Sequence, residues 1–339
     1  MTHPGMALFR VTLMLQALFL LGCERLEVYQ KTTDLAFPDP ALTRCVHEMG
    51  KTRGWSQAGR FTSLRCNNAQ GSVAEGNAIS NIEGIGVLKE LVLLDLSFNQ
   101  INLAEPISTL PRLRELDLGH NRIASIRLRS RSILQSLNLD YNQVDSLNWL
   151  MHFEDLARLT LSHNLIQDLT PLSKLKHLES LDLSSNQIED IAALARLRDL
   201  KELSLAGNSL SSLEGLSNLE NLELLDLSHN NLQQVQPVAR LTGLIELDLS
   251  GNPITDLKPL TELINLESLS LDDTPVSDLH VLASLGRLEK ISLRNLPNVG
   301  CSQILELEKI FGKDALVTDQ KCQRTAETPP LSSHTNPPG

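Results

Sequence analysis

The chain of 339 residues has few aromatic residues, which make up only 3% of the sequence. Hydrophobic residues nevertheless amount to 41%, so we expect a core built from leucine rather than from large rings. The scarcity of rings also disfavours glycan recognition through aromatic platforms. The net charge of −11 disfavours nucleic acid as a partner, because its phosphate backbone requires a basic protein face.

The chain also lacks the motifs of common catalytic sites. It contains no H-E-x-x-H, no G-x-S-x-G and no G-x-x-x-x-G-K-[ST] sequence. Its recurrent serines and aspartates belong to a repeated segment rather than to an isolated catalytic set. We therefore expect a protein without enzymatic activity, without a cofactor and without a metal site.

A repeated asparagine dominates the middle of the chain, returning every 22 residues apart from one step of 21. Within the phrase that precedes each asparagine, leucines alternate with polar residues, as in Leu181, Asp182, Leu183 and Ser184. This period of two indicates a short, half-buried strand. The series comprises Asn99, Asn121, Asn142, Asn164, Asn186, Asn208, Asn230 and Asn252.

A repeat of this length with an L-x-x-L-x-L-x-x-N core predicts an α/β solenoid of leucine-rich repeats. We expect a right-handed superhelix with a curved parallel sheet on its concave face and 3₁₀ or extended returns on its convex face. The asparagine amides should satisfy backbone groups at the turn after each strand. Asn77 begins the register and Thr274 and Leu296 continue it, which gives about eleven coils over residues 77–297.

The repeat also resembles a known family. Segments such as LTLSHNLIQDLTPL and LDLSGNPITDLKPL are similar to the leucine-rich-repeat class shared by bacterial internalin-type surface proteins and a eukaryotic phosphatase regulator. The resemblance covers residues 77–297 and implies an interaction scaffold without catalysis. It also implies that the concave face grips another protein.

The N-terminal segment contains an apolar run, from Val11 to Leu21, that is too short to span a bilayer as a stable helix. It predicts a signal peptide over residues 1–22. The sequence LLGC, which ends at Cys23, resembles the lipobox of bacterial lipoproteins. That resemblance implies an acylated Cys23, such as a palmitate-bearing one, followed by a stalk over residues 23–36. Ordinary signal cleavage or an uncleaved anchor is the alternative.

The lipobox resemblance also implies a location. The protein would be exported and tethered to a membrane of the bacterial envelope without spanning it. Glu24 follows the cysteine in place of aspartate, which implies sorting to the outer membrane.

Four further cysteines flank the repeats. About ten coils at about 4.8 Å each separate the two ends of the solenoid by about 48 Å, whereas the Cα atoms of a disulfide lie within about 7 Å. We therefore predict the pairs Cys45–Cys66 and Cys301–Cys322, formed in an oxidising compartment. Free thiols in a reduced cytosol are the alternative.

The disulfides would close a cap at each end of the repeats. The N-terminal cap, residues 37–76, should contain a helix with Asp39 as its N-cap and Pro40 at its first position. The C-terminal cap, residues 298–322, should contain a helix that Gly312 ends. Residues 323–339 are rich in proline and polar residues, so we expect them to be disordered.

A column of aspartates is the first candidate binding feature. Each stands four residues before the asparagine position, so it should point outward from the concave sheet. Carboxylates in neighbouring coils would lie about 5 Å apart, and their repulsion should raise their pKa values unless a basic protein surface arrives. The alternative is that aspartate is simply common at this position of the repeat. The candidates are Asp95, Asp117, Asp182, Asp226 and Asp248.

A row of rings is the second candidate feature. Phe98, His120, Tyr141 and His163 directly precede the asparagine in four consecutive coils. Adjacent exposed rings are typical of interface hot spots, although the position could also tolerate any residue. The sequence thus predicts a lipid-anchored, exported scaffold that binds a protein. The alternative is a structural spacer of the envelope, or a self-associating surface component, without a distinct ligand.

Overall fold

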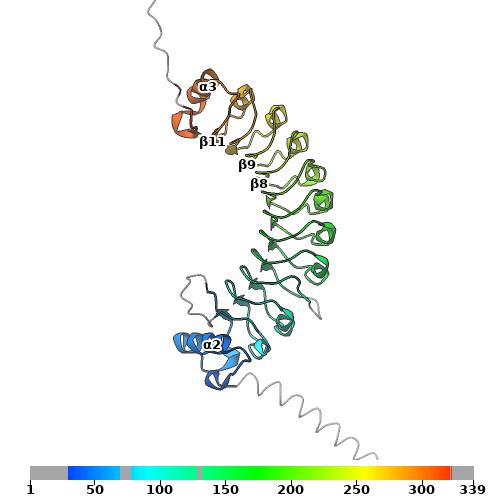
Figure 1. Ribbon diagram of the computed structural model, residues 1–339, viewed down its shortest axis with the longest axis vertical. Coiled ribbons are helices and arrows are strands. Elements are labelled where there is room, and N and C mark those ends of the chain that lie inside the picture. The colour runs from blue at the N-terminus through cyan, green and yellow to red at the C-terminus, as the bar shows by residue number, and fades with distance from the viewer. Residues whose placement is uncertain (1–29, 69–77, 128–131, 321, 323–339) are drawn as a thin grey trace, which may run out of the picture.

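The computed structural model describes residues 30–68, 78–127, 132–320 and 322. These residues wind into an arc, with strands along its inner side and short helical turns along its outer side (Figure 1). Twelve strands in this part of the chain form one parallel sheet, in which each strand pairs with the next one in sequence. The predicted leucine-rich-repeat solenoid is therefore confirmed.

The strands are short and evenly placed. The middle residue of each strand from β1 to β11 is a buried leucine or isoleucine, whereas its two neighbours lie on the concave face. The strands are β1 (Ser63–Arg65), β2 (Leu93–Asp95), β3 (Glu115–Asp117), β4 (Ser136–Asn138), β5 (Arg158–Thr160), β6 (Ser180–Asp182), β7 (Glu202–Ser204), β8 (Leu224–Asp226), β9 (Glu246–Asp248), β10 (Ser268–Ser270), β11 (Lys290–Ser292) and β12 (Leu316–Val317).

The described convex side consists of single 3₁₀ turns, as the sequence predicts, except between β3 and β4, where residues 128–131 lie outside the described residues. The leucine-rich stretch after each asparagine is too short for an α-helix that crosses back over the sheet, so it closes with tighter i to i+3 hydrogen bonds. The turns between strands are η3 (Ile85–Val87), η4 (Glu105–Thr109), η5 (Asn148–His152), η6 (Thr170–Lys174), η7 (Ala192–Arg196), η8 (Leu216–Asn218), η9 (Gln236–Arg240), η10 (Lys258–Glu262) and η11 (His280–Ser284).

The asparagines form a continuous internal column. Asn252, which is 1% exposed, donates from Nδ2 to the carbonyls of Leu227, Leu249 and Ser250 at 2.9, 3.0 and 3.2 Å. Its Oδ1 accepts the backbone N–H of Leu232 in the preceding coil at 3.1 Å. The other asparagines of the series repeat this pattern. The predicted structural role of the asparagines is confirmed.

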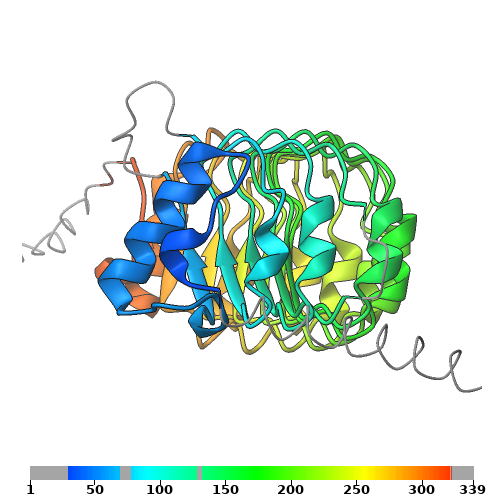
Figure 2. The ribbon, with the colours of Figure 1, turned by 90° about the horizontal axis from the view of Figure 1, so that it is seen from below.

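The N-terminal cap covers the first coil with α2 (Pro40–Arg53), which lies across the end of the solenoid (Figure 2). Asp39 is its N-cap, accepting the N–H groups of Ala41 and Leu42. The second carboxylate oxygen of Asp39 accepts the N–H groups of Ser80 and Asn81 from the convex part of the first coil. This one side chain therefore joins the cap to the repeats.

The N-terminal cap begins earlier than the predicted boundary at residue 37. The turn η1 (Thr32–Asp34) precedes Leu35, which is 3% exposed and whose carbonyl lies 2.8 Å from Nε2 of His47 on α2. An apolar side chain that fills the space beside α2 gains burial, so these residues belong to the cap rather than to a stalk. The turn η2 (Ala58–Arg60) leads into β1.

The C-terminal cap is built from α3 (Cys301–Phe311), which buries Ile304 and Leu307 and ends at Gly312 with a φ of 87°. The side chain of Gln303 holds α3 to the last coil by accepting the N–H of Leu279 and donating to the carbonyl of Ser277. The turn η12 (Lys313–Ala315) then leads into β12, which pairs with β11 and completes the sheet.

Both predicted disulfides are present, one in each cap. Cys45 on α2 is bonded to Cys66 directly after β1, and Cys301 at the start of α3 is bonded to Cys322. Each bond closes a chain segment of 21 residues. The terminal coils are therefore held by covalent bonds at the positions where stacking on one side is missing.

The first coil departs from the predicted register. Ser63 pairs with Leu93, which is 30 residues later, so the first coil is longer than the 22-residue repeat. Its convex part is similar to that of a later coil, because Gly84 and Gly215 both precede a 3₁₀ turn and have positive φ values of 84° and 103°. Asn77, the signal peptide, Cys23 and the tail over 323–339 lie outside the described residues.

Candidate protein-binding surface

The first and third residues of each strand from β1 to β11 form two columns of side chains on the concave face, and the third-residue column contains the predicted aspartates. The register of the sheet aligns Asp95 with Asp117, and Asp226 with Asp248, in directly paired positions. Asn138 and Thr160 separate Asp117 from Asp182, and Ser204 separates Asp182 from Asp226. The strand pairing therefore places the predicted aspartates in one column, in two neighbouring pairs and one isolated member.

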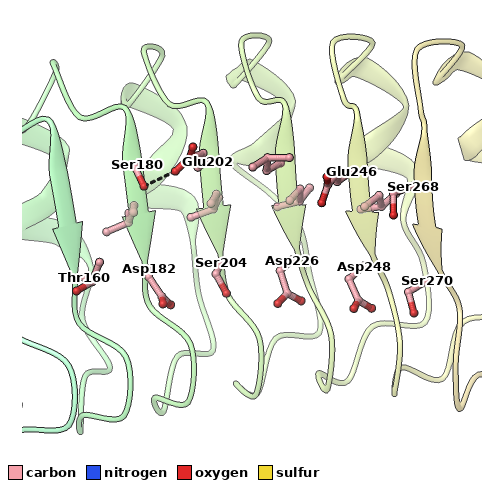
Figure 3. A pocket seen from close by; sticks show the side chains of 15 residues that line it. Thr160, Ser180, Asp182, Glu202, Ser204, Asp226, Glu246, Asp248, Ser268 and Ser270 are labelled. Carbon is pink, nitrogen blue, oxygen red and sulfur yellow. Dashed lines mark hydrogen bonds between the residues drawn. The ribbon is translucent and has the colours of Figure 1, made fainter. Parts of the chain in front are cut away.

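The middle and C-terminal coils form a groove of about 510 Å³ on this face. Asp182, Asp226 and Asp248 lie in one row along it, and Glu202 and Glu246 lie in a parallel row (Figure 3). Ser180 donates a hydrogen bond of 2.7 Å to Glu202. A smaller hollow of about 240 Å³ over β1 to β4 contains Asp95 and Asp117. Carboxylates thus line both hollows of the concave face.

The backbone fixes one oxygen of each groove aspartate. Oδ1 of Asp182 accepts the N–H of Ser184 at 2.8 Å. Asp226 and Asp248 accept from the residue two positions later in the same way, at 2.9 and 2.8 Å. Among the described residues, no second hydrogen-bond donor meets the carboxylates of Asp182 and Asp226, whereas the Ser250 side chain also interacts with Asp248. Asp182 and Asp226 are therefore held in place with one oxygen available to a ligand.

Two aspartates have pKa values above the ordinary range. Burial is the largest cause for Asp117, and the charge of Asp95 adds to it, while the N–H of Gly119 lowers the pKa. Burial also raises the pKa of Asp248, and the charge of Asp226 contributes less. The predicted rise therefore occurs at these two residues, but desolvation outweighs the repulsion that the sequence analysis gave as the cause.

The four predicted rings form a stacked column. The ring centroids of Phe98 and His120 lie 4.0 Å apart, those of His120 and Tyr141 4.2 Å, and those of Tyr141 and His163 4.0 Å. The angles between successive ring planes are 13°, 11° and 16°. Phe98 and Tyr141 remain 39% and 46% exposed. The structure therefore brings these four residues together into one accessible surface, which we call the ring column.

The ring column stands on an unusual backbone conformation that the sequence analysis missed. The residue before the asparagine position has a positive φ in every coil from β2 to β11, and we call this position the turn slot. Glycine adopts such a φ at little cost, whereas other residues are strained there. The slot residues are Phe98, His120, Tyr141, His163, Ser185, Gly207, His229, Gly251, Asp273 and Asn295. Glycine at two of these slots was the signal in the sequence.

The described part of the chain contains no group of three or more histidine, cysteine, aspartate or glutamate side chains arranged to hold a metal ion. It also contains no helix with the length and hydropathy needed to cross a bilayer.

Family models for leucine-rich repeats match most of the repeat region. The model for two-copy repeats matches residues 89–130, 154–196, 198–240 and 242–284, and a second leucine-rich-repeat model matches residues 111–166. These segments amount to more than half of the chain. The protein belongs to the leucine-rich-repeat family. Proteins of this family are generally non-enzymatic interaction scaffolds.

Solved structures of internalins from Listeria monocytogenes are similar to this leucine-rich-repeat protein. Internalin F is 25% identical, with a TM-score of 0.67 over 85% of this chain and 90% of that chain. Internalin C2 is 29% identical, with a TM-score of 0.54 over 71% and 96%. Internalin J, at 21% identity and a TM-score of 0.58 over 80% and 67%, shows the shared fold alone. No curated protein sequence gives a significant match.

Proposed function

We propose that this leucine-rich-repeat protein is an exported, lipid-anchored scaffold that binds a basic segment of a protein partner through its concave face. The observation that carries the proposal is the row of carboxylates in the groove, each anchored by a backbone N–H. Carboxylates crowded at partly buried positions cost free energy unless a cation compensates them. A basic partner would supply that compensation.

The raised pKa values of Asp117 and Asp248 support this proposal. Both aspartates are partly desolvated in the free protein, so a cationic side chain would meet them at a lower desolvation cost than at a fully hydrated surface. The length of the sheet provides contacts over many coils, which suits a protein segment better than a small molecule. The leucine-rich-repeat family to which the chain belongs supports a protein partner as well.

The test compares concave with convex aspartates. The double variant Asp226→Asn/Asp248→Asn removes two charges from the groove while keeping an oxygen that can accept the same backbone hydrogen bonds. The control is Asp190→Asn/Asp256→Asn, because these convex aspartates also accept an N–H two residues later, at 2.8 and 2.9 Å. We expect the concave variant to lose at least tenfold in affinity for the partner captured by the wild-type protein from its own membranes.

Equal affinities of the concave and convex variants would contradict concave-face binding. A spacer or a self-associating component would be indifferent to both double variants, yet it would be sensitive to the deletion of several coils. Removing two coils between β5 and β8 is therefore the complementary experiment. The scaffold proposal requires that the concave double variant, with its length unchanged, already loses the partner.

The lipid anchor is a second part of the proposal, and the lipobox-like sequence before Cys23 supports it. Acylation of this cysteine would tether the scaffold to an envelope membrane, with Glu24 favouring the outer membrane of a bacterium. We expect Cys23→Ala to release the protein from membranes or to leave an unprocessed precursor. Membrane fractionation and sequencing of the mature N-terminus measure this. A mature N-terminus at any residue other than Cys23 would refute the anchor.

A further inference from the structure

The ring column ends where the turn slot changes from large to small residues. One side of the His163 ring is stacked on Tyr141 at 4.0 Å, so its other side is directed toward the next coil, which has Ser185 in the slot. Gly207 occupies the slot of the coil after that. Two consecutive slots therefore contain no ring of their own.

A second ring bounds this interval on the far side. His229 occupies the slot after Gly207, and its ring packs against the following slot residue, Gly251. A Cβ atom added to Gly251 would lie only 2.5 Å from Nδ1 of His229, which shows how closely the ring lies on that backbone. The opposite side of the His229 ring is therefore directed toward Gly207. We call the two small slots between His163 and His229 the ring gap.

The ring gap continues the line of the ring column. Rings in the column follow one another at 4.0 to 4.2 Å, one per coil, and stacked aromatic groups prefer such spacings. Ser185 and Gly207 have φ values of 53° and 64°, within the narrow range of the ring-bearing slots. The backbone is thus the same as in the ring column, and only the flat side chains are missing from it.

The carboxylates of the groove lie beside the ring gap. Ser184, whose N–H is bound by Asp182, directly precedes the slot residue Ser185. Asp226 accepts the N–H of Ser228 in the same way, and Ser228 directly precedes His229. Asp182 is therefore anchored to a turn within the gap, and Asp226 to the turn that bears the bounding ring of His229. Both aspartates thus place negative charge close to the turns that form the gap.

We propose that the ring gap binds the guanidinium group of an arginine from an extended segment of a partner protein. This inference rests on the proposed function and specifies the side chain that the concave face recognises. A guanidinium group is planar and permanently charged, it stacks on rings, and it presents several N–H donors in its plane to carboxylates. The ammonium group of lysine has the same charge but offers no flat surface for stacking. Arginine is therefore selected over lysine.

The experiment uses two nine-residue peptides that are identical except that one carries arginine wherever the other carries lysine. Their affinities for the full chain are measured by fluorescence anisotropy. We expect the arginine peptide to bind at least tenfold more tightly than the lysine peptide. Equal affinities for the wild-type protein would overturn the inference.

Two opposite changes of the gap sharpen the test. Ser185→His/Gly207→His fills it with rings of the chain, at slots whose φ already suits His120, His163 and His229. His163→Ala/His229→Ala removes the bounding rings instead. Both variants should reduce the preference for arginine to less than twofold. A preference that survives either change in a folded protein, as judged by circular dichroism, would overturn the inference.

A matched control and a separate readout complete the design. Asn295→His adds the same ring at a turn slot outside the gap and should leave the preference unchanged. Asp226→Asn/Asp248→Asn should weaken both peptides, which tests the proposed function itself. If both peptides bind equally and both depend on these aspartates, the concave acidic site stands and the arginine inference falls. If neither peptide binds, both proposals fail.

Discussion

The buried asparagine column and the exposed turn slot occupy adjacent residues in the same coils, yet they differ in how uniform they are. Asparagine fills the inner position in eight consecutive coils, because its side-chain amide donates to backbone carbonyls and also accepts a backbone N–H from the preceding coil. The turn slot contains phenylalanine, histidine, tyrosine, serine, glycine, aspartate and asparagine.

This difference separates the residues that hold the fold from those that are free to carry function. The fold constrains the backbone of the turn slot to a positive φ but does not constrain its side chain. Large rings in a row are therefore a feature of this chain rather than of the solenoid. The comparison predicts that substitutions in the asparagine column cause large losses of stability and that substitutions in the turn slot cause small ones.

The largest expected effect is that of Asn252→Ala. It leaves the N–H of Leu232 and the carbonyl of Leu249 without a partner in a site that is 1% exposed, whereas the other two carbonyls each keep a second donor. Because each buried group without a partner costs about 1–3 kcal/mol, we expect a loss of about 4 kcal/mol in the free energy of unfolding. Urea denaturation measures this. The exposed neighbour Asn231→Ala is the control, and a similar loss for both would contradict a special inner column.

The second expected effect concerns Asp39, which joins the N-terminal cap to the convex part of the first coil. Burial raises its pKa, but the N–H groups of Ser80, Asn81, Ala41 and Leu42 lower it by more, so the net pKa lies below the ordinary value. A lowered folded-state pKa stabilises the protein above the unfolded-state pKa of about 3.9. That contribution is lost as the pH falls through the folded-state pKa.

We therefore expect Asp39→Asn to lose about 2 kcal/mol in the free energy of unfolding at pH 7. The difference from the wild-type protein should shrink as the pH falls below about 4. Denaturation at a series of pH values measures both quantities. A difference that stays constant down to acid pH would show that the charge of Asp39 contributes nothing to the cap.

Tyr141 tests the outer side of the comparison. Tyr141→Ala removes stacking on His120 and His163 and should cost about 1 kcal/mol. Tyr141→Gly loses the same stacking but relieves the strain of a φ of 53°, so its stability should lie close to that of the wild type. If glycine proves less stable than alanine at this slot in thermal denaturation, the backbone argument is wrong.

The smallest expected effect is that of Asp248→Asn, and its sign is opposite. A folded-state pKa that burial raises means that the charged carboxylate is penalised in the folded protein at neutral pH. The variant should therefore be slightly more stable at pH 7, by no more than about 0.5 kcal/mol because the site is partly exposed to solvent. The gain should vanish as the pH falls below the unfolded-state pKa. A loss of stability at pH 7 would contradict the raised pKa.

The repeats themselves could be predicted from the sequence because every coil solves the same packing problem. Leucines at alternating positions and an asparagine after them recur often enough to set the strands, the convex turns and the inner column. The cysteine pairs could also be predicted, since the length of a solenoid keeps its two ends apart.

Features that occur once could not be predicted in this way. β12 forms from Leu316 and Val317, which belong to no repeat and pair only because β11 leaves an open sheet edge. The longer first coil likewise has no counterpart among the other coils. The packing of Leu35 into the N-terminal cap depends on contacts with α2 that spacing along the chain does not encode.

The sequence predicted which residues form the candidate site, but not how deeply they are buried or how they pack. The alignment of Asp226 with Asp248 followed from the repeat, but the burial that raises the pKa of Asp248 depends on the depth of the groove. The slot rings could be seen in the sequence, whereas their stacking depends on the left-handed backbone that directs all of them the same way.

Binding through the concave face is the central claim, and photo-crosslinking in intact envelopes tests it most directly. A photoreactive amino acid replaces Ser204 in β7 on the concave side in one variant and Ala193 in η7 on the convex side in another. We predict a covalent adduct with a partner protein from position 204 and none from position 193. An adduct from position 193 alone, or no adduct with another protein from position 204, would contradict the account.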